Sequence, residues 1–144
     1  FIDAVQFHGD ETPEECFSRA FPYYKALRIR DRADIARITD YRSPRVLTDA
    51  YSDAAYGGTG QCINAELVPL IAREKPLWIA GGIGPENAAK IINSYRPELI
   101  DASSSLESSP GHKDKEKMRE YFRAVEQASY RISERLVSER RQNP

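Results

Sequence analysis

Residues that can carry out acid, base or anion-binding chemistry stand directly after short apolar runs of this sequence. Asp49 closes the run Val46-Leu47-Thr48, and a carboxylate at the end of a strand is held rigidly enough for proton transfer. From composition alone, a helix cap or a turn explains Asp49 equally well. Gln6 and His8 stand at the end of the first run, although a single histidine more often has a structural role. Asp49 is the candidate proton donor, and His8 is a second polar candidate.

Two segments of small residues form a candidate phosphate site. Gly81-Gly82-Ile83-Gly84 joins an apolar run to a helix expected to begin at Pro85, and Ser103-Ser104-Ser105 follows the next run. Glycines let backbone N–H groups approach an anion, and a helix N-terminus adds partial positive charge. Each segment alone is explained equally by a tight turn that needs small residues. Together they predict phosphate binding at Gly81, Gly82, Ser103 and Ser104.

The elements that position these residues are read from the alternation of apolar runs and helix-like segments. The predicted strands are Ala4 to Phe7, Tyr24 to Ile29, Arg45 to Thr48, Leu77 to Ala80 and Leu99 to Ala102. Strands that alternate with helices over short connections form a parallel sheet, with functional residues at the C-terminal ends of the strands. This pattern alone does not separate an open doubly wound sheet from a (β/α)₈ barrel.

Helix starts are marked by capping residues between the strand runs. Thr12 is an N-cap with Pro13 at the first helical position, and Asn64 can cap the helix that carries Leu67, Leu70 and Ile71. Another helix extends over Asp31 to Tyr41, and the last begins near Asp114 and carries apolar residues at helical spacing through Ile132. Helices therefore follow all five predicted strands.

Composition restricts the classes of function. The chain has 144 residues, of which 40% are hydrophobic and 30% charged, and its formal charge is −1. That length suits one domain, and the charge gives no electrostatic case for nucleic acid or an anionic membrane. Cys16 and Cys62 are too few for a disulfide framework or a metal cluster. We therefore expect a cytoplasmic protein, without a metal site and without nucleic-acid or membrane partners.

The candidate residues lie in motifs that resemble the phosphoribosylanthranilate isomerase family from the fourth strand of its barrel onward. The matching runs are, in order, Asp3-Ala4-Val5-Gln6-Phe7-His8-Gly9-Asp10-Glu11, Lys25-Ala26-Leu27-Arg28-Ile29, Asp49 with Tyr56-Gly57-Gly58-Thr59-Gly60, Ala80-Gly81-Gly82-Ile83-Gly84-Pro85-Glu86-Asn87, and Asp101-Ala102-Ser103-Ser104 with Lys113-Asp114. The order is collinear to about Val125. The resemblance implies a (β/α)₈ barrel, incomplete here with about five βα units.

The resemblance also implies an activity. In that family, N-(5'-phosphoribosyl)anthranilate undergoes an Amadori rearrangement to 1-(2-carboxyphenylamino)-1-deoxyribulose 5-phosphate in tryptophan biosynthesis, without a metal or other cofactor. Asp49 matches the general acid that protonates the ring oxygen. The residues that match the family's phosphate-binding loops are Gly81, Gly82, Ser103 and Ser104. The residues expected to contact the rest of the substrate are Gln6, His8, Gly58, Thr59 and Gly60.

Some features depart from that pattern. Ser105 replaces the usual glycine after the two serines, and Ile63-Asn64-Ala65 replaces the family's Phe-Asp-Trp. The family's base is a cysteine at the end of strand one, which neither Cys16 nor Cys62 matches.

We therefore expect a chain that lacks the base and is inactive alone, and that depends on an N-terminal barrel part or on self-association. The barrel part is expected over 1–125 and a helical extension or tail over 126–144. The alternative is a non-catalytic part-barrel that binds a phosphosugar or serves as an assembly module.

Overall fold

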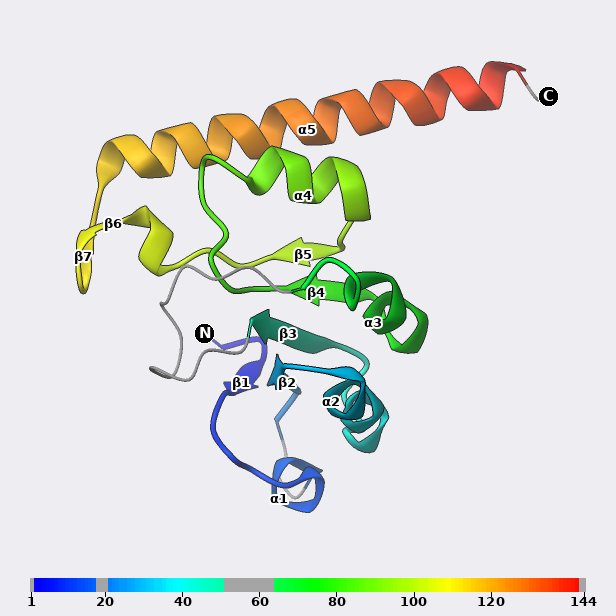
Figure 1. The fold of residues 1–144 in the computed structure, drawn as a ribbon, viewed down its shortest axis with the longest axis vertical. Helices are drawn as coiled ribbons and strands as arrows, with labels where there is room; N and C mark the ends of the chain where they lie inside the picture. The colour runs from blue at the N-terminus through cyan, green and yellow to red at the C-terminus, as the bar shows by residue number, and fades with distance from the viewer. Residues whose placement is uncertain (1, 18–20, 51–63, 143–144) are drawn as a thin grey trace.

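The computed structural model describes residues 2–17, 21–50 and 64–142 (Figure 1). Gly58, Thr59, Gly60 and Cys62 lie outside these ranges. The elements are, in chain order, β1 (Val5–Phe7), α1 (Pro13–Phe17), β2 (Tyr23–Ile29), α2 (Arg32–Ala36), η1 (Arg37–Asp40), β3 (Val46–Ala50), α3 (Val68–Glu74), β4 (Leu77–Ile79), α4 (Ala88–Tyr95), β5 (Leu99–Ile100), η2 (Ser104–Leu106), β6 (Glu107–Ser109), β7 (His112–Lys113) and α5 (Lys115–Gln142).

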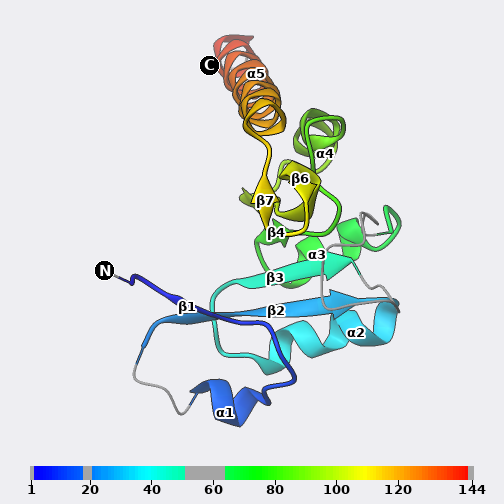
Figure 2. The ribbon, with the colours of Figure 1, turned by 90° about the vertical axis from the view of Figure 1, so that its left-hand side faces the viewer.

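The five predicted strands form one parallel sheet in the order β1-β2-β3-β4-β5 (Figures 1 and 2). In a doubly wound sheet the strand order reverses at a switch point, whereas in a barrel each strand pairs with the next along the chain. The observed order therefore favours the barrel-type topology. Within the described residues the sheet is open, since β1 and β5 each pair with a single strand.

Side chains alternate between the two faces of the sheet. On β2, Leu27 and Ile29 join the main core, which includes Ile35 and Ile38 of the helical layer. The opposite, inner face holds a small cluster of Ala26, Leu47 and Ala80, with Tyr24, Trp78 and Leu99 partly buried against it. Because strand side chains alternate with a period of two, residues that follow this inner pattern at the strand ends face the mouth of the sheet.

The predicted helix starts are confirmed at two positions. Thr12 accepts from the Glu15 N–H at 3.3 Å while the Glu15 carboxylate accepts from the Thr12 N–H at 2.8 Å, which is a capping box. Asp31 accepts from the N–H groups of Ala33 and Asp34 at the start of α2.

Two helix predictions need correction. Asn64 does not cap α3, which begins at Val68; its side chain instead accepts from Glu66 N–H in a preceding turn. The predicted helix over Asp31 to Tyr41 is divided into α2 and the 3₁₀ helix η1.

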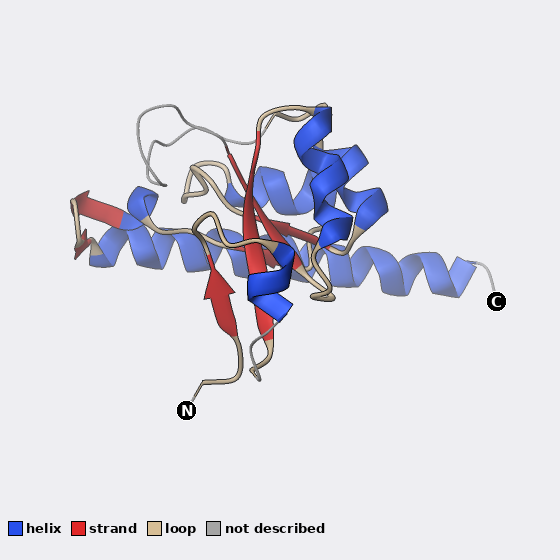
Figure 3. Ribbon diagram, turned by 90° about the horizontal axis from the view of Figure 1, so that it is seen from below, coloured by secondary structure: helices blue, strands red, loops and turns tan. Residues whose placement is uncertain are grey.

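The segment after β5 also differs from the prediction of a helix directly after each strand. The short helix η2 and the antiparallel hairpin β6–β7 come first, and α5 follows. Asp114 accepts from the N–H groups of Glu116 and Lys117 at the start of α5. This helix packs along α4 and then extends past it (Figures 1 and 3). It is continuous across residue 125, and no helix among the described residues is long and apolar enough to cross a membrane.

The carboxylate of Asp34 ties α2 to the end of β2. Asp34 is buried and accepts from the Arg30 backbone N–H at 2.9 Å and from Arg30 Nε at 3.0 Å, with Arg37 at 3.7 Å. Burial raises the pKa of Asp34, but the hydrogen bonds from Arg30 and the charges of Arg30 and Arg37 outweigh it and hold that pKa below its ordinary value. The ionised carboxylate therefore stabilises the fold above the unfolded-state pKa and loses this effect as the pH falls through the folded-state pKa.

We predict that Asp34→Asn lowers the free energy of unfolding by about 2 kcal/mol at pH 7, because the hydrogen bonds that Arg30 donates to a charged acceptor are weakened. The difference should shrink as the pH falls below about 4, where Asp34 of the unfolded chain begins to take up a proton, and should be lost as the pH falls through the lower folded-state pKa. Urea denaturation across that pH range measures it. Glu116→Gln, in an exposed pair with Arg119, should change stability little. A loss for Asp34→Asn that is equal at pH 7 and at pH 3 would contradict the prediction.

Candidate functional site

A cavity of about 360 Å³ opens at the C-terminal edge of the sheet. Its lining includes the predicted residues Gln6, His8, Asp49, Gly81, Gly82, Ser103 and Ser104. These come from the ends of β1 and β3 and from the loops after β4 and β5, so the parallel sheet brings together segments far apart in sequence. The remaining predicted residues, Gly58, Thr59 and Gly60, lie outside the described residues.

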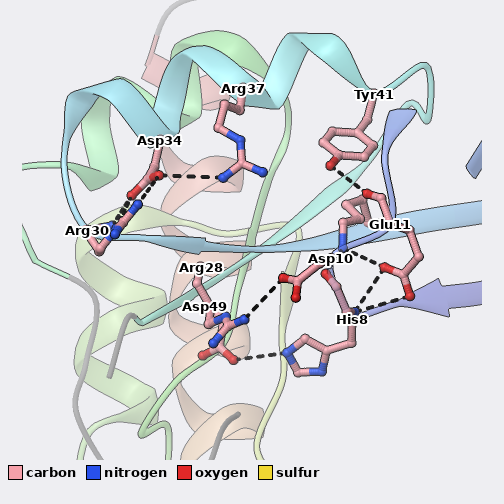
Figure 4. A network of polar contacts seen from close by, with 11 residues as sticks. His8, Asp10, Glu11, Arg28, Arg30, Asp34, Arg37, Tyr41 and Asp49 are labelled. Atoms are coloured by element: carbon pink, nitrogen blue, oxygen red, sulfur yellow. Dashed lines mark hydrogen bonds and ion pairs between the residues drawn. The ribbon is translucent and has the colours of Figure 1, made fainter. Parts of the chain in front are cut away.

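Asp49 reaches the cavity because of the alternation along β3. Thr48 is fully buried and donates to the Trp78 carbonyl at 2.8 Å, so the next residue faces the other way. The Asp49 side chain is 10% exposed, and its Oδ2 lies 3.6 Å from His8 Nε2 (Figure 4). A carboxylate so enclosed at a strand end has a fixed direction, which is what a proton donor to a bound substrate requires.

Beneath the cavity, Gln6 is held by an aromatic side chain of the inner face. The Tyr24 hydroxyl donates to Gln6 Oε1 at 2.9 Å, and the Tyr24 ring packs edge-on against Trp78 at 5.2 Å between centroids. Burial, assisted by the negative charge of Asp101, raises the pKa of Tyr24, which keeps this donor protonated. The amide of Gln6 is thus oriented by a fixed partner.

The glycine loop after β4, which lines the same cavity as Gln6, has backbone angles that suit the phosphate prediction. Gly81 has φ 91° and Gly82 has φ 59°, a left-handed region that favours glycine. Asn87 braces the turn, since its side chain donates to the Gly82 carbonyl at 2.8 Å and accepts from Gly84 N–H at 2.9 Å. The loop leads into α4, an eight-residue helix. Small residues and a braced turn leave this backbone accessible to an anion.

The serine loop after β5 packs against the glycine loop. A Cβ atom at Gly84 would lie 2.9 Å from Ser105 Cβ, so this approach requires glycine at position 84. Lys113, from the hairpin, donates to the Ser103 carbonyl at 2.9 Å and pairs with Glu107. Ser105 therefore fits beside the glycine loop and lines the same cavity.

A second cavity, of about 320 Å³, shares His8 with the first and is rich in charge. Arg30 and Arg37 pair with Asp34, and Arg28 pairs with Asp10 at 3.8 Å (Figure 4). These cations are compensated by neighbouring carboxylates, so the second cavity is bounded by an ion-pair network around the end of β2.

Comparison with known proteins places this arrangement in a family. The sequence profile of N-(5'-phosphoribosyl)anthranilate isomerase matches residues 1–124. The chain belongs to this family. The relative from Trichlorobacter lovleyi, an N-(5'-phosphoribosyl)anthranilate isomerase, is 42% identical over 128 residues, which are 88% of this chain and 62% of the relative. The corresponding protein of Geobacter sulfurreducens is 39% identical over 85% of this chain and 60% of its own length. The chain thus spans about three fifths of these relatives.

Solved structures of the family share the fold. The phosphoribosyl anthranilate isomerase of Thermus thermophilus superposes with a TM-score of 0.72 at 32% identity, over 88% of this chain and 62% of that chain. A phosphoribosyl anthranilate isomerase in complex with reduced 1-(o-carboxyphenylamino)-1-deoxyribulose 5-phosphate superposes with a TM-score of 0.70 at 29% identity. The match covers 87% of this chain and 60% of that chain. The 3-hexulose-6-phosphate synthase of Salmonella typhimurium, at 14% identity and a TM-score of 0.59, shares the fold alone. The α/β barrel-type fold that the sequence predicted is confirmed.

Several residues around this cavity were given no role from the sequence, although three of them stand in the family-like motifs. Asp101 and Glu107 line the cavity, and Asn87 and Lys113 brace its loops. Asp101 follows a strand as Asp49 ends one, so the strand-end rule could have found it. The bracing roles depend on contacts across the fold and leave no local signal. Among the described residues, no group of three histidine, cysteine or acidic side chains is placed to hold a metal ion.

We predict that inorganic phosphate or ribose 5-phosphate, titrated into the ¹⁵N-labelled chain, shifts the backbone amide signals of Gly82 and Ser104. Gly82→Ala should weaken binding about tenfold, because a left-handed backbone costs a non-glycine residue roughly 1–2 kcal/mol and the methyl group blocks close approach. Gly111→Ala is the matched control, since Gly111 also has positive φ (79°) but lies on the hairpin with nothing within 4 Å of its Cβ position. Unchanged Gly82 and Ser104 signals at saturating ligand would refute the site.

Proposed function

We propose that this chain forms the acid and phosphate-binding part of an N-(5'-phosphoribosyl)anthranilate isomerase. The proposal depends mainly on the cavity that joins Asp49 to two loops of small residues, Gly81-Gly82 and Ser103-Ser104. The substrate's phosphate binds to the backbone of those loops, and its ribose ring extends across the cavity toward Asp49. Gln6 and His8 contact the sugar from the β1 side.

Each residue has a defined part in the proposed rearrangement. Asp49 gives its proton to the ring oxygen as the C1–O bond breaks, which opens the ribose and leaves an iminium ion at C1. A base then removes the C2 proton to give an enolamine, which becomes the ketone as C1 takes up a proton and the C2 hydroxyl loses one. Cys16 cannot be that base, because it is fully buried in α1 on the helical side. Among the described residues no strand ends in a cysteine, and we propose from the family resemblance that a segment equivalent to the family's first strand supplies the base.

The partner that supplies this base is proposed to be an N-terminal barrel part. Trp78, Tyr24 and Leu99 are only partly buried on the inner face of the described sheet, and β1 and β5 offer unpaired edges. Unpaired edges and half-covered apolar side chains favour association with further strands. Self-association through the same edges is the other outcome. We place the reaction in the cytoplasm, in tryptophan biosynthesis, without a metal or other cofactor.

The rival function is a phosphosugar-binding module without catalysis. It is favoured by the absence of a strand-end cysteine among the described residues. The two functions differ in turnover, since both predict phosphate binding.

We predict that the chain alone neither turns over substrate nor sediments as a compact monomer. Fusing the first three strands of the Trichlorobacter lovleyi relative to its N-terminus should restore both. Analytical ultracentrifugation and the loss of substrate fluorescence measure these outcomes. A monomeric chain with normal turnover would show that the base lies within these 144 residues. A folded fusion that binds substrate but does not convert it would favour the rival function.

In the active fusion, we predict that Asp49→Asn lowers kcat by about 10²–10⁴-fold and changes KM much less, because general acid catalysis acts in the transition state. Asp40→Asn, on the exposed 3₁₀ helix η1, is the control and should leave both constants unchanged. Turnover of the Asp49→Asn enzyme at the wild-type rate would remove Asp49 from the mechanism.

A further inference from the structure

Lys25 is a buried charge that the proposed chemistry does not use. It is 1% exposed and lies on the helix-facing side of β2, in the same alternation as Leu27 and Ile29. Removing an ammonium group from water is costly unless its hydrogen bonds are satisfied. Lys25 Nζ donates to the Gly9 carbonyl at 2.6 Å and to Glu11 Oε2 at 2.9 Å. Both partners belong to the loop that follows β1.

Glu11 binds the N–H group of Gly9, whereas Lys25 binds its carbonyl group. Its carboxylate oxygens lie 3.0 and 3.3 Å from the Gly9 N–H that they accept, and its own carbonyl accepts from the Tyr41 hydroxyl at 3.0 Å. Burial raises the pKa of Glu11, but the hydrogen bonds and charge of Lys25, with the backbone hydrogen bonds, outweigh it and lower that pKa. Both backbone groups of Gly9 are therefore engaged by an ionised pair.

His8 immediately precedes Gly9, and its side chain lines the cavity that contains Asp49. β1 is an edge strand that ends at Phe7, so the sheet ladder does not extend to His8. Its side chain is 42% exposed, and its Nε2 lies 3.6 Å from Asp49 Oδ2 (Figure 4). His8 therefore lies between Phe7, the last residue of the ladder, and the Gly9 backbone that Lys25 and Glu11 hold.

We propose that Lys25 and Glu11 are positioning residues, whose ion pair, between the buried lysine and the partly exposed glutamate, holds the Gly9 backbone and thereby keeps His8 against Asp49. Neither side chain lines the cavity that contains Asp49, so both act through the loop. The expected effect of this pair on turnover rests on the proposed function. Its expected effect on the contact between His8 and Asp49 does not. A pair that only stabilised the fold would leave the His8–Asp49 contact intact in every variant that still folds.

The test uses the two histidines of the chain, His8 and the exposed His112 on β7. Asp49→Asn in the otherwise wild-type chain should shift the imidazole signals of His8 and leave those of His112 unchanged. In Lys25→Met, the same Asp49→Asn change should shift the His8 signals about threefold less, because the contact is no longer maintained. His112 and the dispersion of the amide spectrum report whether the variant remains folded.

The chain offers a matched control in Lys75. Its Nζ donates to the carbonyls of Tyr41 and Ser43, both at 2.6 Å, so it is another lysine that joins backbone segments. Lys75→Met should retain the full response of His8 to Asp49→Asn. If Lys25→Met does not fold, Glu11→Gln decides the question, since it keeps the shape of the side chain and removes the charge; it should also reduce the response. A full response in a folded Lys25→Met or Glu11→Gln chain would overturn the proposal.

Kinetics separate this proposal from the proposed function. The imidazole measurement needs no turnover, so it tests the positioning role even if no form of the chain is active. In the active fusion, Lys25→Met should lower kcat about tenfold with a smaller change in KM, and Lys75→Met should change neither. An unchanged kcat in Lys25→Met together with a reduced His8 response would remove His8, and with it the positioning role, from catalysis.

Discussion

The parallel pairing of β2 with β3 is the constraint on which the cavity depends. Their register runs from Lys25↔Val46 to Ile29↔Ala50 and pairs Arg28 with Asp49, and both strands are largely buried. Side chains on a strand alternate between faces, so a slip of β3 by one residue would turn Asp49 toward the helices and Thr48 toward the cavity. The apolar core on the helix side opposes such a slip, since it would bring polar Asp49 into that core. Packing on one face thus fixes the chemistry on the other.

Much of the fold and site could be predicted because it follows from local pattern. Continuous apolar runs mark buried parallel strands, and strand ends in such sheets converge on one edge. This rule alone selected Asp49, the glycine loop and the serine loop, which line one cavity. Thr12 could be predicted as a cap because a capping side chain bonds to backbone groups two or three residues away.

The remaining features depend on contacts that no short window of sequence contains. The sequence of α3 permits a start at Asn64, but the helix begins at Val68, where its side chains enter the core. From the sequence, Lys25 is an ordinary charged residue in a strand. Its burial, and its contacts with Gly9 and Glu11, become apparent only in the structure. The hairpin β6–β7 consists of a three-residue strand and a two-residue strand. Neither strand has the alternation of apolar residues that would predict it from the sequence.

The two edges of the sheet use charged side chains to different effect. At the N-terminal edge, Glu98 accepts from Arg45 and from Trp78 Nε1, and these hydrogen bonds lower the pKa of Glu98, but the group is exposed and such contacts contribute little individually. Buried Lys25 and Asp34 hold the backbone that follows β1 and β2, so the loss of one partner leaves an uncompensated charge. Single substitutions should therefore disturb the loops around the cavity more than the sheet beneath them. The geometry of the site depends on a few buried charges, whereas the fold depends on many apolar contacts.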